Sequence, residues 1–277
     1  MKRPLYTIAD EEFATLLDRA DAAFKDKGIK YMLVGGVATQ AHIINYLCKE
    51  DKKLIDFINS PDFRLQDHLR ATDDIDITLN PRKNGEEYDK VAFAGKIYGV
   101  LENIVGKEGI FMSPTENHLV SLSLERKGIA RPVFRLGLDD NKDSEKITSF
   151  NFYKGAADTN ERWGKDIQEF ENRFYFQVMD RAEDVKIPFC QNKDIILKVE
   201  KAEDLIATKL VRGREKDWND ILSLINHSES AGKPIDYEII REMLCGADPR
   251  TEKAYIPFVE KYEDFMRLKD TLIKEST

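Results

Sequence analysis

Two aspartates two positions apart, Asp74 and Asp76, are the residues of this chain whose types and spacing could do chemistry. In an extended strand alternate side chains share a face, so both carboxylates would lie on one face, with Ile75 and Ile77 on the other. Neighbouring carboxylates repel each other, and such a pair suits a bound divalent cation, typically the Mg²⁺ that a nucleotide also holds. The spacing therefore predicts a metal–nucleotide site on one face of a strand.

A pair of glycines lies upstream of these acids. Residues 29–34 read as a short buried strand, Gly35 and Gly36 interrupt it, and residues 37–47 read as a helix. Backbone N–H groups at such a turn, together with the helix dipole, favour an anion such as phosphate. The pair is also explained by a turn that needs positive φ, and it does not match the longer glycine patterns of dinucleotide folds or P-loops.

Arg70 and Thr72 lead into the two acids. Arg70 could neutralise phosphate charge or pair with an acid, and Thr72 could donate to a phosphate oxygen or to the local backbone. Taken in order with the glycine turn and the acids, they favour a site where a triphosphate meets its metal.

A second group of charged residues follows near the C-terminal third. Lys209 lies on an expected helix at 202–211 and could contact phosphate or be a surface lysine. Asp217 and Asp220 are one turn apart on the next expected helix, 215–226. They could be acids near the metal or salt-bridge partners of Lys209, Arg212 or Arg214.

Composition limits the class of protein. The chain has 277 residues, 34% of them charged, and a net charge of −8, so no basic excess favours nucleic acid or an anionic membrane surface. The three cysteines show neither disulfide nor metal spacing, and no apolar run reaches the roughly 20 residues that span a bilayer. We expect a cytoplasmic protein without a membrane partner.

Periodicity predicts the elements that must position these residues. The further helices are expected at 8–27, 86–105, 236–244 and 252–274. The further strands are expected at 74–79, 118–124, 132–138, 147–153, 173–179 and 195–199.

The ordered motifs resemble the AbiEii/AbiGii-type nucleotidyltransferases of the polymerase-β-like superfamily, which include toxins of toxin–antitoxin systems. The resemblance rests on four stretches: Leu33-Val34-Gly35-Gly36-Val37-Ala38 with His42, Arg70-x-Thr72-x-Asp74-Ile75-Asp76-Ile77, Glu203-Asp204-Leu205-Ile206-Ala207-x-Lys209 and Arg214-x-x-Asp217-x-x-Asp220-Ile221. It implies an α+β fold: a catalytic domain over residues 1–200, with a mixed sheet flanked by helices and an insertion at about 49–69, then a helical C-terminal region over 201–277 that contributes to the active-site cleft.

The resemblance also implies transfer of a nucleoside monophosphate from an NTP to a hydroxyl acceptor. Gly35 and Gly36 would cradle the triphosphate, and Asp74 and Asp76 would hold Mg²⁺ or Mn²⁺. Asp217 would support the site. Contacts to the nucleotide would come from Arg70, Thr72, Lys209 and Arg214. The acceptor could be RNA such as tRNA, a protein or a small molecule such as an antibiotic, and an antitoxin would be a partner.

The sequence departs from the family pattern at the third carboxylate, which commonly acts as the base for the incoming hydroxyl. By position it would fall in 147–152, where Asn151 replaces the expected acid, and Asp180 is the alternative. This departure motivates a rival hypothesis, a nucleotide-binding or protein-interaction module that kept the fold and lost turnover.

Overall fold

The computed structural model describes residues 7–48, 53–61, 64–72, 74–80, 99–100, 110–112, 133–137, 147–153, 178–190, 193–245 and 256–275. Side chains are described for fewer residues, and those of strands β3, β4 and β5 are not among them. The predicted strand at 118–124 and nearly all of the predicted helix at 86–105 lie outside these ranges.

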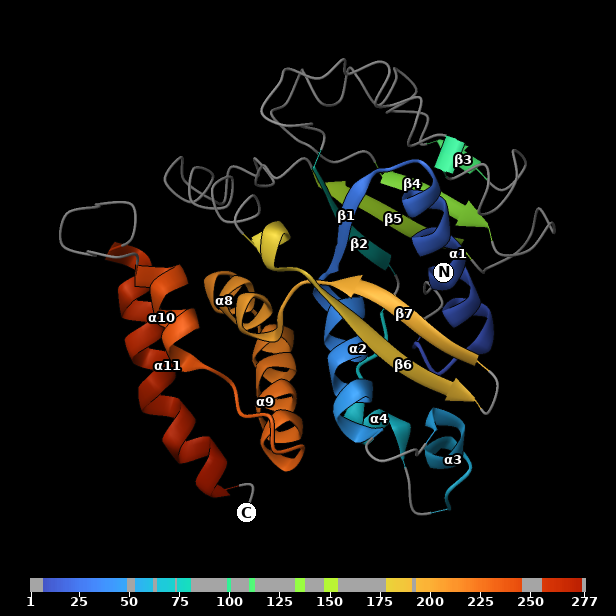
Figure 1. Ribbon diagram of the computed structural model, residues 1–277. Helices are drawn as coiled ribbons and strands as arrows, with labels where there is room; N and C mark the ends of the chain where they lie inside the picture. The colour runs from blue at the N-terminus through green and yellow to red at the C-terminus, as the bar shows by residue number, and fades with distance from the viewer. Residues whose placement is uncertain are drawn as a thin grey trace.

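Within the described residues, seven strands form one sheet, in the order β3-β4-β5-β2-β1-β7-β6 (Figure 1). Its strands are β1 (Lys30–Val34), β2 (Asp74–Asn80), β3 (Ile110–Met112), β4 (Val133–Gly137), β5 (Ile147–Tyr153), β6 (Glu183–Cys190) and β7 (Lys193–Val199). The pairs β1–β7 and β2–β5 are parallel, whereas β1–β2, β3–β4, β4–β5 and β6–β7 are antiparallel. The expected mixed sheet is therefore confirmed.

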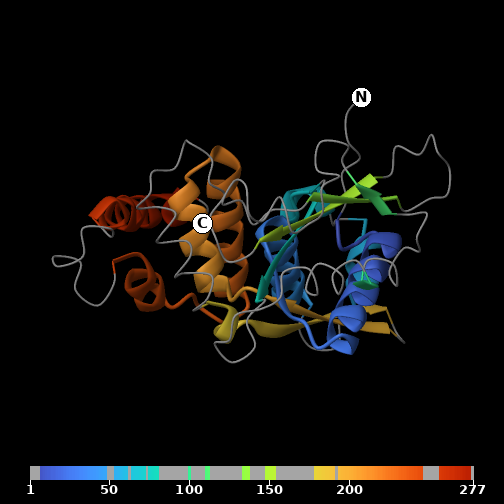
Figure 2. The same cartoon turned by 90° about the horizontal axis from the view of Figure 1, so that it is seen from above.

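Helices flank this sheet and then form a group of their own. The helices that precede β2 are α1 (Glu11–Asp26), α2 (Gly35–Leu47), α3 (Leu54–Ile58) and α4 (Leu65–His68). The C-terminal helices are α8 (Ala202–Arg212), α9 (Glu215–Ser230), α10 (Tyr237–Cys245) and α11 (Ile256–Glu275). Figure 2 shows the C-terminal helices on one side of the molecule and the sheet with α1 on the other. This arrangement confirms the α+β class with a helical C-terminal region.

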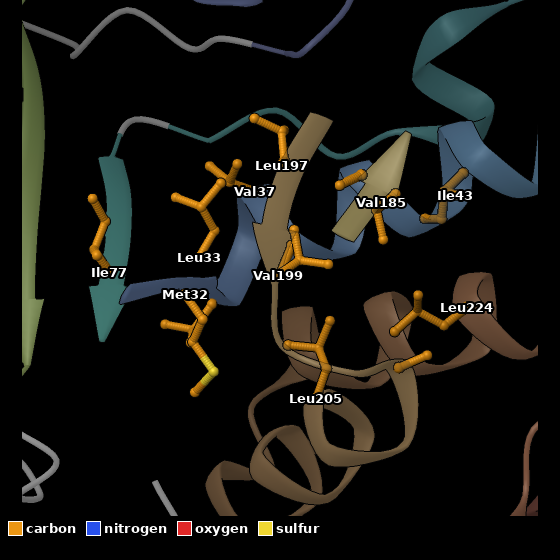
Figure 3. Packing of buried hydrophobic residues seen from close by; sticks show 14 of the residues in the cluster. Met32, Leu33, Val37, Ile43, Ile77, Val185, Leu197, Val199, Leu205 and Leu224 are labelled. Atoms are coloured by element: carbon orange, nitrogen blue, oxygen red, sulfur yellow. The ribbon is translucent and has the colours of Figure 1, made fainter. Parts of the chain in front are cut away.

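Helix α2 connects the two parts, because it contacts strands β1, β2 and β6 as well as helices α8 and α9. Buried apolar side chains from all these elements form one core, in which Leu33, Val37, Leu197, Leu205 and Leu224 are labelled in Figure 3. Since burial of such side chains is the main favourable term in folding, this core fixes the end of β1 relative to α8 and α9.

Two sequence predictions differ from the structure. The predicted strand at 173–179 is wrong at its end, because residues 178–181 are helical. Strand β6 was not predicted, although Val185, Ile187 and Phe189 alternate along it; it is an edge strand with an irregular register between Pro188 and Cys190. Proline lacks the N–H that a central strand needs, and edges tolerate it. No helix in the described ranges combines the length and hydropathy needed to cross a bilayer.

Candidate functional site

The glycine turn lies where β1 ends and α2 begins. Gly35 has φ +65°, which confirms the predicted positive-φ turn, and α2 begins at Gly35 rather than at Val37. The register pairs Val34 with Asp76, so the carboxylate of Asp76 lies across from the end of β1. A Cβ atom at Gly35 would come within 2.7 Å of Asp76 Oδ2, and the turn can therefore accept no side chain there without displacing Asp76.

Arg70 and Thr72 lie against the second glycine of the turn. A Cβ atom at Gly36 would be 3.2 Å from Thr72 Oγ1 and 3.4 Å from Arg70 Nη2. The structure thus brings together Gly35, Gly36, Arg70, Thr72 and Asp76. They come from two stretches of the sequence, 35–36 and 70–76, which were predicted to share one site.

The start of α2 is suited to a negatively charged group. No side chain caps its N-terminus, and its first turn contains no acidic residue. The first N–H groups of a helix have no partner within the helix, and the helix dipole makes this end partly positive. Arg70 Nη2 adds a guanidinium beside the same turn. The turn therefore combines backbone donors with a permanent cation.

Strand β2 carries the two aspartates. Ile75 and Ile77 are fully buried and Asp76 is half-buried, as the predicted alternation requires. Asp74 is the first residue of β2, and its side chain lies outside the described part. Among the side chains that the structure describes, no group of three or more His, Cys, Asp or Glu residues could hold a metal ion. The two-aspartate metal site therefore stays a prediction.

The two candidates for the third carboxylate lie in different places. Asn151 on β5 is the register partner of Asp76 on the parallel strand β2. Asp180 is exposed and ion-paired with Lys30, the first residue of β1. Four strand steps, about 13 Å, separate Lys30 from Val34 at the glycine turn. The fold thus places position 151 beside Asp76 and Asp180 near the opposite end of β1.

Lys209 and Asp220 form a buried ion pair that also includes Arg70. Lys209 Nζ lies 2.6 Å from Asp220 Oδ2, and both side chains are 3% exposed. Arg70 Nε donates to Asp220 Oδ1 over 3.0 Å, and Arg70 Nη2 donates to Oδ2 over 2.9 Å. Of the two roles weighed for Asp220, the structure shows the salt bridge. Lys209 is neither a surface lysine nor directed into open space.

Charge and burial compete in this Lys209–Asp220–Arg70 cluster. Burial alone would raise the pKa of Asp220, but the hydrogen bonds and charges of Arg70 and Lys209 outweigh it and hold that pKa below its usual value. Burial lowers the pKa of Lys209, against the opposing effect of Asp220. Two basic groups thus share one carboxylate, with Arg70 the member nearer to solvent.

Asp217 and Arg214 form a separate pair at the start of α9. Arg214 Nε and Nη2 donate to Asp217 Oδ2 and Oδ1 over 2.7 and 3.0 Å, and the Arg214 backbone N–H donates to Oδ2 over 3.3 Å. Asp217 is 1% exposed. The carboxylate therefore occupies the position of the acid in a capping box, and the salt-bridge role weighed for it is observed.

Glu200 is a buried acid that no sequence motif indicates. It follows β7 directly, its N–H donates to Leu33 O, and its side chain is 1% exposed with Thr208 Oγ1 donating to it over 3.4 Å. Burial, reinforced by the charge of Asp204, raises the pKa of Glu200 to about 8. Its carbonyl oxygen lies 2.8 Å from Nε2 of buried His42, so this histidine holds the backbone that follows β7. In the sequence Glu200 is one of five charged residues within 198–204, so no local signal marks it.

Comparisons with known proteins give structural similarity only. The fold is similar to the crystal structure of an antigenic nucleotidyltransferase-like protein from Paracoccidioides brasiliensis, at 12% identity and a TM-score of 0.45, covering 91% of this chain and 94% of that one. It is also similar to the solution structure of the antibiotic-resistance factor ANT(2'')-Ia, at 14% identity and a TM-score of 0.37, covering 95% and 99% of the two chains. No protein-family model matches the sequence, and no curated protein matches it.

Proposed function

We propose that this chain is a metal-dependent nucleotidyltransferase that moves a nucleoside monophosphate from an NTP to a hydroxyl acceptor. The observation that carries the proposal is the meeting of Asp76, Arg70 and Thr72 at the turn formed by Gly35 and Gly36. A triphosphate needs backbone donors, a cation and a carboxylate-held metal within one small volume. The turn supplies the backbone donors, and Arg70 supplies the cation, beside the carboxylate of Asp76.

The residues fit a divalent cation at Asp74 and Asp76. The absence of a side chain at Gly35 leaves room against Asp76 Oδ2, and the alternation of a strand predicts that Asp74 faces the same way. Bound there, Mg²⁺ or Mn²⁺ would neutralise triphosphate charge and stabilise the charge that develops on transfer. Gly35 and Gly36 would hold the phosphates with backbone N–H groups, Thr72 would donate to a phosphate oxygen, and Arg70 would compensate their charge.

The reaction proposed is an in-line displacement at the α-phosphorus. The acceptor oxygen forms a bond to that phosphorus, and the bond from phosphorus to the oxygen bridging the α- and β-phosphates breaks. The electron pair leaves with pyrophosphate, and the proton of the acceptor hydroxyl passes to solvent water. We extend the proposal to an RNA such as tRNA or a protein as acceptor, and to a toxin controlled by an antitoxin. The support for this extension is the motif resemblance alone.

A label-transfer assay tests this function. The protein is incubated with each α-³²P-labelled NTP, Mg²⁺, and either total RNA, a cell lysate or small hydroxylated antibiotics. We expect label in one acceptor pool with wild type, and none with the Asp74→Ala/Asp76→Ala variant. Equal transfer by that variant, or no transfer by wild type into any pool, would contradict the proposal. Antibiotic resistance on expression, rather than growth arrest, would identify a small-molecule acceptor.

A second candidate function is a nucleotide-binding module without turnover. Asn151 at the register position beside Asp76 favours it, because an amide cannot accept the hydroxyl proton as a carboxylate does. Calorimetry separates the two functions: NTP binding that does not depend on Mg²⁺, with no pyrophosphate released, would favour the module.

A further inference from the structure

One face of α9 holds the segment that carries Arg70. Asp220, Ser223 and His227 follow one another at spacings of three and four residues, so they lie along one face of the helix. Ser223 Oγ donates to His68 O over 3.3 Å, and His227 Nε2 lies 3.0 Å from His68 Nδ1. These three residues of α9 thus contact residues 68–70, which lie about 150 residues earlier in the chain.

Helix α2 also holds this segment. Gln40 Nε2 donates to Arg70 O over 2.9 Å, and Gln40 Oε1 accepts from the Ile8 N–H over 2.8 Å. The backbone at Arg70 is therefore tied to the helix that begins at the glycine turn. The direction of the Arg70 side chain is set separately, by α9.

Asp220 sets that direction with two parallel hydrogen bonds. A carboxylate that accepts from both Nε and Nη2 fixes the plane of the guanidinium, which a single contact cannot do. Asp220 is itself fixed, because it is 3% exposed and its Oδ2 also accepts from buried Lys209. The result is that Arg70 Nη2 lies beside Gly36. A long side chain that is about one-third exposed would otherwise sample several rotamers.

We propose that Asp220 is a positioning residue that acts through Arg70: it aims the Arg70 guanidinium at the triphosphate bound over Gly35 and Gly36, and so makes the C-terminal helices part of the nucleotide site. This inference rests on the proposed function. Asp220 touches neither nucleotide nor metal in this arrangement, and Lys209 acts as the second counter-charge that keeps Asp220 in place.

A double-mutant cycle on nucleotide binding tests this role. The ligand is an α,β-methylene NTP with Mg²⁺, which cannot undergo transfer at the α-phosphorus, and calorimetry measures its Kd. Arg70→Gln should weaken binding roughly tenfold or more, since it removes a charge-assisted contact. Asp220→Asn should weaken binding severalfold. The double variant should bind within about twofold of Arg70→Gln alone, because Asp220 works through Arg70.

Two further variants separate positioning from a structural role. Asp21→Asn removes a carboxylate that is buried, accepts a hydrogen bond from the Tyr31 hydroxyl and pairs with Lys25, on α1 and outside the glycine turn. It should lower stability as Asp220→Asn does, but leave the Kd unchanged. Arg70→Lys keeps the charge but cannot form both bonds to Asp220, so it should weaken binding even if Asp220→Asn fails to fold.

The outcomes distinguish this inference from the function on which it rests. If wild type binds no triphosphate analogue, both are overturned. If wild type binds but the losses from Arg70→Gln and Asp220→Asn multiply in the double variant, only the inference is overturned. Arg70→Lys with the wild-type Kd would also overturn the inference alone.

Discussion

Asp76 occupies the space that any side chain at Gly35 would fill, and its Oδ2 lies 2.7 Å from the position of a Cβ atom there. Two features therefore restrict position 35: the positive φ of its backbone and the carboxylate opposite it. The first belongs to the turn itself and the second to the candidate site. The two effects can be separated, because Gly28 also has a positive φ but has no heavy atom within 4 Å of a Cβ atom placed on it.

Gly35→Ala should lower stability and abolish nucleotide binding. The positive φ alone costs about 1 kcal/mol for alanine, and the added methyl group displaces Asp76. Gly28→Ala is the matched control, since Gly28 has φ +60° and no heavy atom within 4 Å of a Cβ there. Urea unfolding and calorimetry with an NTP should show a similar backbone penalty for both variants and a binding defect for Gly35→Ala alone. Normal nucleotide affinity in Gly35→Ala would contradict the site.

Glu200→Gln should change how stability depends on pH. The pKa of Glu200 is about 8 in the fold and near 4.5 when unfolded, so between these values the folded state binds the extra proton. The stabilisation that the Glu200 carboxyl gives the wild-type fold is therefore fully present below about pH 4.5 and is lost as pH rises through 8. Glutamine stays neutral, and the variant should gain stability relative to wild type between pH 5 and pH 9 in urea unfolding. A constant difference between the two proteins across that range would show that Glu200 is ionised in the fold.

Asp217→Ala should lower the free energy of unfolding by about 1 kcal/mol, since it removes the acid of the capping box at the start of α9. Glu215→Ala is the comparison, because Glu215 is an exposed acid in the same first turn. Its loss should cost only a few tenths of a kcal/mol. Denaturant titrations of both variants measure this. Equal losses of unfolding free energy in the two variants would mean that the Asp217–Arg214 pair stabilises the fold no more than an unpaired acid near the positive end of the helix dipole does.

Local patterns predicted the elements that carry the site. The alternation of Ile75 and Ile77 with the aspartates, and the apolar run that stops at Gly35, are visible within a few residues, and both appear in β1 and β2 as expected. Such signals depend on the period of a strand and on the special backbone of glycine, which act locally. The helices from residue 202 onward followed from the same kind of pattern.

Long-range pairings could not be predicted in this way. The sequence offered several basic partners for Asp220, and only the fold selects Arg70, 150 residues away, together with Lys209. Burial of Glu200 likewise depends on the helices that cover it. Strand β6 has the alternation of a strand in Val185, Ile187 and Phe189, but Pro188 argues against a strand, and the fold tolerates this proline because β6 lies at the edge of the sheet.

The position of the label that wild type transfers tests the proposed nucleotidyl transfer most directly. Parallel reactions with α-³²P and γ-³²P NTP, Mg²⁺ and the same acceptor pool distinguish nucleotidyl from phosphoryl transfer. We expect label in the acceptor from the α-position only. Asp76→Asn should lower this transfer at least about 100-fold. Asp184→Asn, which changes an exposed acid on β6, should transfer as much label as wild type. Transfer of the γ-label, or full α-transfer by Asp76→Asn, would contradict nucleotidyl transfer at this site.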